Sequence, residues 1–451
     1  MDAGRHPNIT LLTYSEVEEI SGYVGNFTAR IRKRARSVNE ELCTGCGICQ
    51  EKCPRKVIDT GFEAGLGKRK AIYFSFSQAI PNLPVIDRES CLFFTKGRCK
   101  ICEKSCPAGA IDYTQQDELL EVQVGAIIVA TGFGMWDPVQ LPQYSYGLSP
   151  NIITGLQFER LSSAGGPTGG EILTAEGEKP ERVAIIHCVG SRDHNAHEYC
   201  SRVCCMYSLK QAHLVRDKTG AEVYEFYMDM RAFGKAYEEF YERVQEEGVT
   251  FIRGRGAEVE VLPDGKLRVK GDDANLGRMV AADVDMVVLA TAIEPQPDAD
   301  RVASIFGLGR TPDGWFAEAH PKLRPVETAT AGIFLAGCAQ GPRDVPDTVA
   351  HAGAAALEVV RMFNQGEVTI SPTVAVVNPE ECVGCGECII SCPYTAIARN
   401  AEGKAEVNAA LCHGCGTCVA TCPSGAITAL HFTDQEIVAQ IDGLLNVLRI
   451  A

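Results

Sequence analysis

The sequence predicts an α/β protein: a doubly wound core of parallel strands, with one small cysteine-rich α+β domain inserted in it and a second after it. Two observations lead to this fold class. Strand-like runs ending in glycine or threonine, the first of them a strand predicted over 122–130, alternate with helical stretches between about residues 116 and 367, a pattern that favours a parallel sheet. In addition, 16 of the 21 cysteines gather in residues 43–106 and 382–422.

Composition excludes several classes of protein. The 451 residues are 45% hydrophobic and 22% charged, which is typical of a globular chain of about two to four domains. The longest apolar run, residues 124–130, is far shorter than the roughly 18 residues that indicate a membrane span. A net charge of -15 argues against nucleic acid as a partner. Because no secretory signal follows Met1, we expect reduced or metal-bound thiols in the cytoplasm.

The sixteen cysteines form four runs, and three of them match C-x2-C-x2-C-x3-C-P. A thiolate at every third residue of a tight loop can reach three iron atoms of a cuboidal cluster, and the cysteine before proline ligates the other cluster of a pair. Tetrahedral zinc, the alternative, uses paired C-x2-C elements without the trailing Cys-Pro. The predicted 4Fe-4S ligand sets are therefore crossed: Cys43, Cys46, Cys49 with Cys106; Cys91, Cys99, Cys102 with Cys53; Cys382, Cys385, Cys388 with Cys422; Cys412, Cys415, Cys418 with Cys392.

The first pair of runs departs from this pattern. Residues 92–98 separate Cys91 from Cys99, and residues 54–90 lie between the two runs. We interpret the first pair as a two-cluster ferredoxin domain with loop insertions, in which Cys91 fits the spacing least well.

Three segments between the ferredoxin-type regions are similar to successive landmarks of flavoprotein disulfide reductases and thioredoxin reductases. They read GAIIVATGF, VVLATA and LAGCAQGPRDVPDTVAHAGAAA. The resemblance implies a helix that starts near Asp347 and points its N-terminus, with its positive dipole, at a reduced flavin. Strand ends of an unrelated doubly wound sheet are the alternative. The implied FAD-binding residues are Ala130, Thr131, Gly132, Gly337, Cys338, Asp347 and Thr348, with simple packing as the alternative for Cys338.

Two departures from such reductases affect the prediction. No G-x-G-x-x-G fingerprint occurs in the chain, so either Met1 is a late start or the pyrophosphate cradle lies on another polypeptide. The middle segment has VAIIHCVGSRD where a second fingerprint should follow the strand, so we do not expect a nicotinamide site.

Four more thiols lie in that middle segment. Cys188 closes a strand, at the end where ligands bind in open sheets. A helix predicted over 201–216 puts Cys200 and Cys204 one turn apart, with Cys205 about 100° further round. We interpret the four as an unconventional fifth 4Fe-4S site; buried structural thiols or a redox dithiol are the alternatives. Other candidate ligands are His187, His194 and His197.

The ordered set of these segments, with CSRVCCM and CAQGPRDVPD, is similar to the A-subunit of heterodisulfide reductase over essentially the whole chain. The resemblance implies an oxidoreductase subunit that carries FAD and four or five 4Fe-4S clusters and performs electron bifurcation. Its implied partners are the B- and C-subunits, a hydrogenase, formate or NADH-linked donor subunit, and ferredoxin, in an oligomer without an integral membrane segment. A non-catalytic polyferredoxin on a degenerate flavin scaffold is the alternative.

The same reasoning divides the chain into seven segments. Residues 1–38 are a remnant of the FAD domain without its N-terminal half, 39–115 the inserted ferredoxin domain, 116–180 the continued FAD domain, 181–295 an NAD-type α/β domain with the extra cluster, 296–367 the last part of the FAD domain, 368–430 the C-terminal ferredoxin domain and 431–451 a C-terminal helix.

Overall fold

The computed structural model describes residues 2–367, 372–394 and 396–450, the side chains of 446–450 excepted. Its largest unit is a five-stranded parallel sheet in the order β10-β17-β11-β12-β13. Strands buried on both faces of a sheet need continuous apolar runs, and β17 is buried along its whole length. The strands are β10 (Ile152–Thr154), β17 (Met286–Thr291), β11 (Arg182–Val189), β12 (Glu222–Tyr227) and β13 (Thr250–Arg253).

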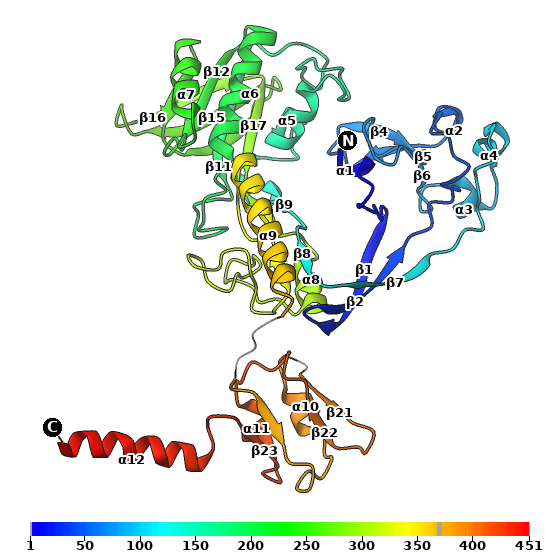
Figure 1. The fold of residues 1–451 in the computed structure, drawn as a ribbon. Helices are drawn as coiled ribbons and strands as arrows, with labels where there is room; N and C mark the ends of the chain where they lie inside the picture. The colour runs from blue at the N-terminus through cyan, green and yellow to red at the C-terminus, as the bar shows by residue number, and fades with distance from the viewer. Residues whose placement is uncertain (1, 368–371, 395, 451) are drawn as a thin grey trace.

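Alternate residues of β11 bury their side chains in two different cores. Val183 and Ile185 pack with the helices, whereas Ala184 and Ile186 pack with an antiparallel sheet on the other face. The helices are α5 (Gly155–Ser162), α6 (Cys204–Thr219) and α7 (Tyr237–Glu246); the antiparallel sheet is β14 (Gly256–Val261), β15 (Leu267–Asp273) and β16 (Arg278–Val284) (Figure 1).

A second unit is built from segments far apart in the sequence. The parallel pair β8 (Ile127–Val129) and β19 (Ile333–Leu335) packs with the long helix α9 (Val345–Gln365). The antiparallel sheet beside it contains β1 (Ser15–Tyr23), β2 (Asn26–Lys33) and β7 (Glu118–Val124). The smaller elements are β9 (Gly134–Met135), β18 (Ile293–Glu294), α8 (Ala299–Phe306), η1 (Pro138–Gln140), η2 (Pro142–Tyr144) and η3 (Gly337–Ala339).

The apolar run over 122–130, predicted as one strand, is two. It is interrupted at Gly125, so that β7 pairs antiparallel with β2 while β8 pairs parallel with β19. A Cβ at Gly125 would lie 2.9 Å from the Phe363 ring of α9, which leaves no room for a side chain at the crossing.

The first cysteine-rich region extends from the antiparallel sheet of β1, β2 and β7 (Figure 1). Its insertion, expected as a loop, folds partly into the antiparallel pairs β3–β4 and β5–β6. Glu63 of the insertion pairs with Arg160 of α5 at 3.1 Å, which ties this region to the parallel sheet. The elements are α1 (Asp2–Arg5), α2 (Ile48–Lys52), β3 (Lys56–Asp59), β4 (Gly67–Lys70), β5 (Ile72–Tyr73), β6 (Val85–Ile86), α3 (Leu92–Lys96) and α4 (Ile101–Ser105).

The second cysteine-rich region repeats one helix-and-strand unit. Helices α10 and α11 contact each other, β20 pairs with β23 and β21 with β22. The elements are β20 (Ala375–Val377), α10 (Glu387–Ser391), β21 (Ile397–Arg399), β22 (Ala405–Val407), α11 (Thr417–Thr421), β23 (Ile427–Ala429) and α12 (Asp434–Ile450). Within the described part of the chain, no helix is long and apolar enough to cross a membrane.

Candidate iron-sulfur and flavin sites

The structure gathers the ferredoxin-type cysteines into four hollows of similar size. Each hollow is lined by three cysteines of one run and the cysteine before proline of the other. These are the four crossed sets predicted above: Cys43, Cys46, Cys49, Cys106; Cys53, Cys91, Cys99, Cys102; Cys382, Cys385, Cys388, Cys422; Cys392, Cys412, Cys415, Cys418.

Glycine explains how three of these loops curl so tightly. The helices α2, α10 and α11 each follow a glycine in the left-handed region, Gly47, Gly386 and Gly416, with φ of 78°, 88° and 76°. A residue with a Cβ is disfavoured in that region, so the CxGCGxC spelling permits three cysteines to face one hollow.

The fourth loop achieves the same result without those glycines. Lys100 precedes α4 with φ -136°, and the left-handed turn falls on Cys99 itself, with φ 87°. Cys91 is the residue before α3, and its amide bonds the carbonyl of Asp87 at 2.9 Å. The insertion therefore places Cys91 in the hollow through a short helix rather than through a two-residue spacer.

Hydrogen bonds to sulfur in these hollows come from backbone amides and from hydroxyl groups. The amides of Ala110 and Ala396 each donate to the sulfur of the cysteine four residues earlier, Cys106 and Cys392, at 3.3 Å. Among the hydroxyls, that of Tyr113 lies 3.0 Å from the sulfur of buried Cys102. Donors of this kind stabilise a cluster's negative charge and so influence its potential.

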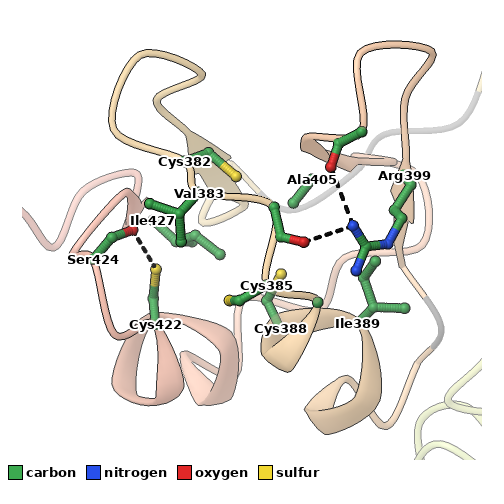
Figure 2. Close-up of a pocket in the computed structure, with 13 residues that line it drawn as sticks. Cys382, Val383, Cys385, Cys388, Ile389, Arg399, Ala405, Cys422, Ser424 and Ile427 are labelled. Carbon is green, nitrogen blue, oxygen red and sulfur yellow. Dashed lines mark hydrogen bonds between the residues drawn. The ribbon is translucent and has the colours of Figure 1, made fainter.

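One hollow of the C-terminal region shows how charge is arranged around it (Figure 2). The Arg399 guanidinium is directed at the backbone, donating to the Gly384 carbonyl at 2.6 Å, and not at sulfur. Backbone amides of Ala405 and Gly384 lower the pKa of Cys382. In the first region, burial raises the pKa of Cys49 to about 11.

The four cysteines of the α/β core come from three different elements. Cys188 lies near the end of β11 with φ 56°, Cys200 lies in the following loop, and Cys204 and Cys205 begin α6. Hydrogen bonds from Cys204 lower the pKa of Cys188 to about 7 and that of Cys205 to about 4. Cys204 therefore contacts both Cys188 and Cys205.

The prediction of a helix over 201–216, which would place Cys200 and Cys204 one turn apart, is wrong at the start of that helix. Helix α6 begins at Cys204, and Arg202 before it has φ 65°. The turn lets the Arg202 amide donate to the Cys200 sulfur at 3.2 Å. Cys200 is thus held by the loop, because a helix that extended back through Arg202 would not let the Arg202 amide donate to the Cys200 sulfur.

Basic side chains with unused donors surround these core thiols. Buried nitrogens without a partner include Nδ1 of His187, Nη1 of Arg192 and Nε of Arg202. The charges of Asp229, Cys188 and Cys200 raise the pKa of Arg192, although burial lowers it. Donors without acceptors around a group of thiols suit an anionic, sulfur-rich occupant.

The other two candidate histidines have carboxylate partners. His194 is exposed and pairs with Glu198 at 2.9 Å, and His197 pairs with Glu294 at 3.2 Å. Among described residues, no three His, Cys, Asp or Glu side chains converge at the spacing of a single metal ion.

The predicted flavin residues lie at the ends of β8 and β19 and at the start of α9. Ala130, Thr131 and Gly132 follow β8, and Gly337 and Cys338 follow β19, both glycines with positive φ. The helix starts at Val345, two residues earlier than implied, because Asp344 caps it by accepting from the Asp347 amide at 2.9 Å.

Around that helix start the side chains are already engaged with one another. Cys338 donates to the Arg343 carbonyl at 3.4 Å and lies 4.0 Å from the Thr348 hydroxyl. The carboxylate of Asp347 pairs with Arg202 of the core thiol loop. Nε of Arg343, like that of Arg202, is buried without a partner.

Sequence reasoning missed the charged residues around the core thiols. Glu225 bonds His187 and lies in the interior of strand β12, where an acidic residue between Tyr224 and Phe226 was the available signal. Arg192 and Arg202 give no such signal, because an arginine in a polar loop is ordinary.

Comparison with known proteins identifies the class first. A family model described as "4Fe-4S dicluster domain" matches residues 375–429, and a second one, described as "4Fe-4S binding domain", matches residues 36–59. The chain is therefore an iron-sulfur protein, and 4Fe-4S clusters are its cofactors, as predicted.

Relatives identify the particular family. The A-subunit of H(2):CoB-CoM heterodisulfide,ferredoxin reductase from Methanothermobacter marburgensis is 50% identical, over 99% of this chain and 67% of that protein. The iron-sulfur A-subunit of CoB--CoM heterodisulfide reductase from Methanocaldococcus jannaschii is 46% identical, over 99% and 68%. The chain belongs to the heterodisulfide reductase A-subunit family and spans about two thirds of the length of these relatives.

Solved structures that resemble the chain include thioredoxin reductases. That of T. acidophilum has a TM-score of 0.36 and 14% identity, over 55% of this chain and 69% of its own. That of Lactococcus lactis has a TM-score of 0.35 and 14% identity, over 65% and 86%.

These findings confirm the predicted family, the α/β fold class with two ferredoxin-type regions, and the enzyme class, an oxidoreductase subunit that acts within a complex. They agree with the predicted 4Fe-4S clusters. The chain is thus an iron-sulfur electron-transfer subunit of the heterodisulfide reductase type.

Proposed function

We propose that this chain is the electron-bifurcating subunit of a cytoplasmic heterodisulfide-reductase-like complex. It takes an electron pair from a hydrogenase, formate or NADH-linked donor subunit, passes one electron to ferredoxin and sends the other to a disulfide-reducing acceptor subunit. Two such cycles deliver two electrons and two protons to one disulfide, which becomes two thiols, while two ferredoxin electrons are stored. Relatives whose names include H(2), formate and ferredoxin as substrates support this choice.

The observation that supports the proposal most directly is the pair of contacts that Arg202 makes. Arg202 bonds the Cys200 sulfur through its backbone amide and pairs with Asp347 of α9 through its side chain. The loop that holds Cys200 and the start of α9 are therefore joined by one residue. Bifurcation requires this adjacency, because a two-electron cofactor must release single electrons to a nearby one-electron carrier.

For the iron-sulfur clusters, we propose the ligands given by the crossed sets, together with Cys188, Cys200, Cys204 and Cys205 for a fifth cluster. The unpaired donors on His187, Arg192 and Arg202 support this fifth site. The domain boundaries predicted from the sequence, 39–115 and 368–430 for the ferredoxin domains and 181–295 for the α/β domain, complete the proposed organisation.

For FAD, the residues present fit the flavin end of the molecule. The glycines at 132 and 337 keep the strand ends open, and a Cβ on Gly337 would approach Thr348 to 3.1 Å. The partnerless Nε of Arg343 lies close to this helix start, next to Arg202. When bound, FAD would supply two-electron chemistry; the residues at the strand ends and at the start of α9 would hold it and would present positive charge to it.

The flavin content of the protein tests the proposal. The anaerobically purified chain, co-expressed with its partner subunits, should show flavin absorbance and fluorescence, and ferredoxin reduction should require the disulfide acceptor. A complex that contains its full iron but no flavin would instead establish the polyferredoxin alternative. Ferredoxin reduction that proceeds equally without the acceptor would refute bifurcation.

A further inference from the structure

A histidine and a glutamate form a fully buried pair within the parallel sheet. His187 of β11 and Glu225 of β12 expose 1% and 0% of their side chains, and Nε2 lies 2.9 Å from Oε2. Burying two ionisable groups carries a desolvation penalty that their attraction often fails to recover. An apolar pair would fill this space at no such cost, so the pair calls for a functional explanation.

The pair lies directly beside the core thiols. His187 precedes Cys188 in β11, and its ring is near enough to Cys205 to lower the pKa of that thiol, after the larger effect of Cys204. Its Nε2 is occupied by Glu225, while its Nδ1 is buried and has no partner. Nδ1 is therefore the ring atom that is available for a hydrogen bond with a sulfur.

Counting protons shows which group Nδ1 offers. If the shared proton sits on Nε2, Nδ1 must also carry one for the pair to be neutral; if it sits on Glu225, the neutral imidazole carries its proton on Nδ1. Either arrangement presents an N–H. The remaining arrangement, a bare Nδ1 beside an ionised Glu225, would bury a net negative charge next to thiolates, which the low dielectric of the interior opposes.

We propose that Glu225 positions His187 so that Nδ1–H donates to the Cys205 sulfur and raises the reduction potential of the fifth cluster. The proposal rests on the fifth cluster of the proposed function. Reduction adds negative charge to a cluster, and a fixed N–H donor stabilises the reduced form more than the oxidised form. The fifth cluster thereby becomes a better electron acceptor than its four thiolates alone would make it.

The test is a potentiometric titration followed by EPR on the intact holoprotein. The signal of the fifth cluster is first assigned as the one that Cys204→Ser removes. Replacing the pair by His187→Leu with Glu225→Leu keeps the site filled and removes the donor. We expect the one-electron reduction equilibrium of that cluster to fall about tenfold, equivalent to about 59 mV, with iron content unchanged.

Two further variants make the comparison specific. His213 of α6 and Glu247, the residue after α7, pair at 2.7 Å, so His213→Leu with Glu247→Leu is the control and should leave the potential unchanged. His187→Asn with Glu225→Leu restores an amide N–H in place of the ring N–H and should recover most of the shift. A double-leucine variant with a wild-type potential overturns the proposal.

A measurement on the unsubstituted protein does not depend on the variants folding. With 15N-labelled histidine, pulsed EPR of the assigned signal should show a nitrogen coupling in a site without histidine ligands. A missing coupling overturns the role of His187 alone. If Cys204→Ser removes neither iron nor an EPR signal, it is the fifth cluster itself that is refuted.

Discussion

The ferredoxin-type sites and the core thiol site use the same ligand chemistry in different surroundings. A ferredoxin-type hollow takes three cysteines from one loop, curled at glycines such as Gly386 and Gly416, and its donors to sulfur are backbone amides and uncharged hydroxyls. The core site takes its cysteines from a strand, a loop and a helix, and ionisable side chains surround it. Local spacing can specify a ligand set, whereas the charge around it depends on which elements the fold brings together.

The largest expected effect separates the core site from the others. Cys204→Ser should remove about four iron atoms per chain and leave the four ferredoxin-type clusters intact, because Cys204 contacts both Cys188 and Cys205. Iron analysis and EPR measure this. Cys338→Ser, outside every set, is the control and should leave iron unchanged. Full iron in the Cys204 variant would mean that these thiols are structural.

A glycine substitution tests how far the backbone of a ferredoxin-type loop determines cluster binding. A Cβ at Gly414 would lie 2.0 Å from the Thr373 carbonyl oxygen, and its φ of 64° already disfavours a side chain. Gly414→Ala should therefore lose most of the iron held by Cys392, Cys412, Cys415 and Cys418. At Gly416, φ is 76° but nothing lies within 4 Å, so Gly416→Ala should cost only about 1 to 2 kcal/mol of backbone strain. Equal iron loss in the two variants would show that contact with Thr373 is irrelevant.

Arg202→Gln addresses the link between the core site and α9. The ion pair with Asp347 is part-exposed, at 31% and 38%, so its loss should weaken flavin retention by no more than about fivefold, or roughly 1 kcal/mol. Flavin released on dilution of the holoprotein measures this. Arg361→Gln, at the other end of α9, is the control. Unchanged retention in the Arg202 variant would remove this pair from the flavin site.

The smallest effect concerns one side-chain donor in the inserted region. Tyr113→Phe removes the hydroxyl beside the Cys102 sulfur and should lower the reduction equilibrium of that cluster about fivefold, the value of a hydrogen bond of about 1 kcal/mol. Tyr73→Phe is a control, since that ring stacks on Arg69. A titration with no difference between the two variants would show that backbone donors alone set this potential.

The sequence predicts those features of the molecule that are determined by residues close together in the chain. The crossed cysteine sets follow from a loop spacing fixed by cluster geometry, and the structure gathers those same sets. The start of α6 was missed because the periodicity of CSRVCC allows a helix from Ser201, whereas the left-handed turn at Arg202 depends on its contacts with Cys200 and Asp347. The break at Gly125 was missed because apolar residues stand on both sides of it, and only the crossing of α9 decides it.

By itself, the sequence determined the family, the alternation of strands and helices, and the number and grouping of the thiols, because these are written in spacing and periodicity. Only the tertiary structure decided what surrounds the core thiols. His187 and Glu225 are 38 residues apart and meet because β11 and β12 are neighbours in the sheet. Arg202 reaches Asp347 across 145 residues of chain. Burial and charge at a site are properties of neighbouring elements, and no local pattern of residues contains them.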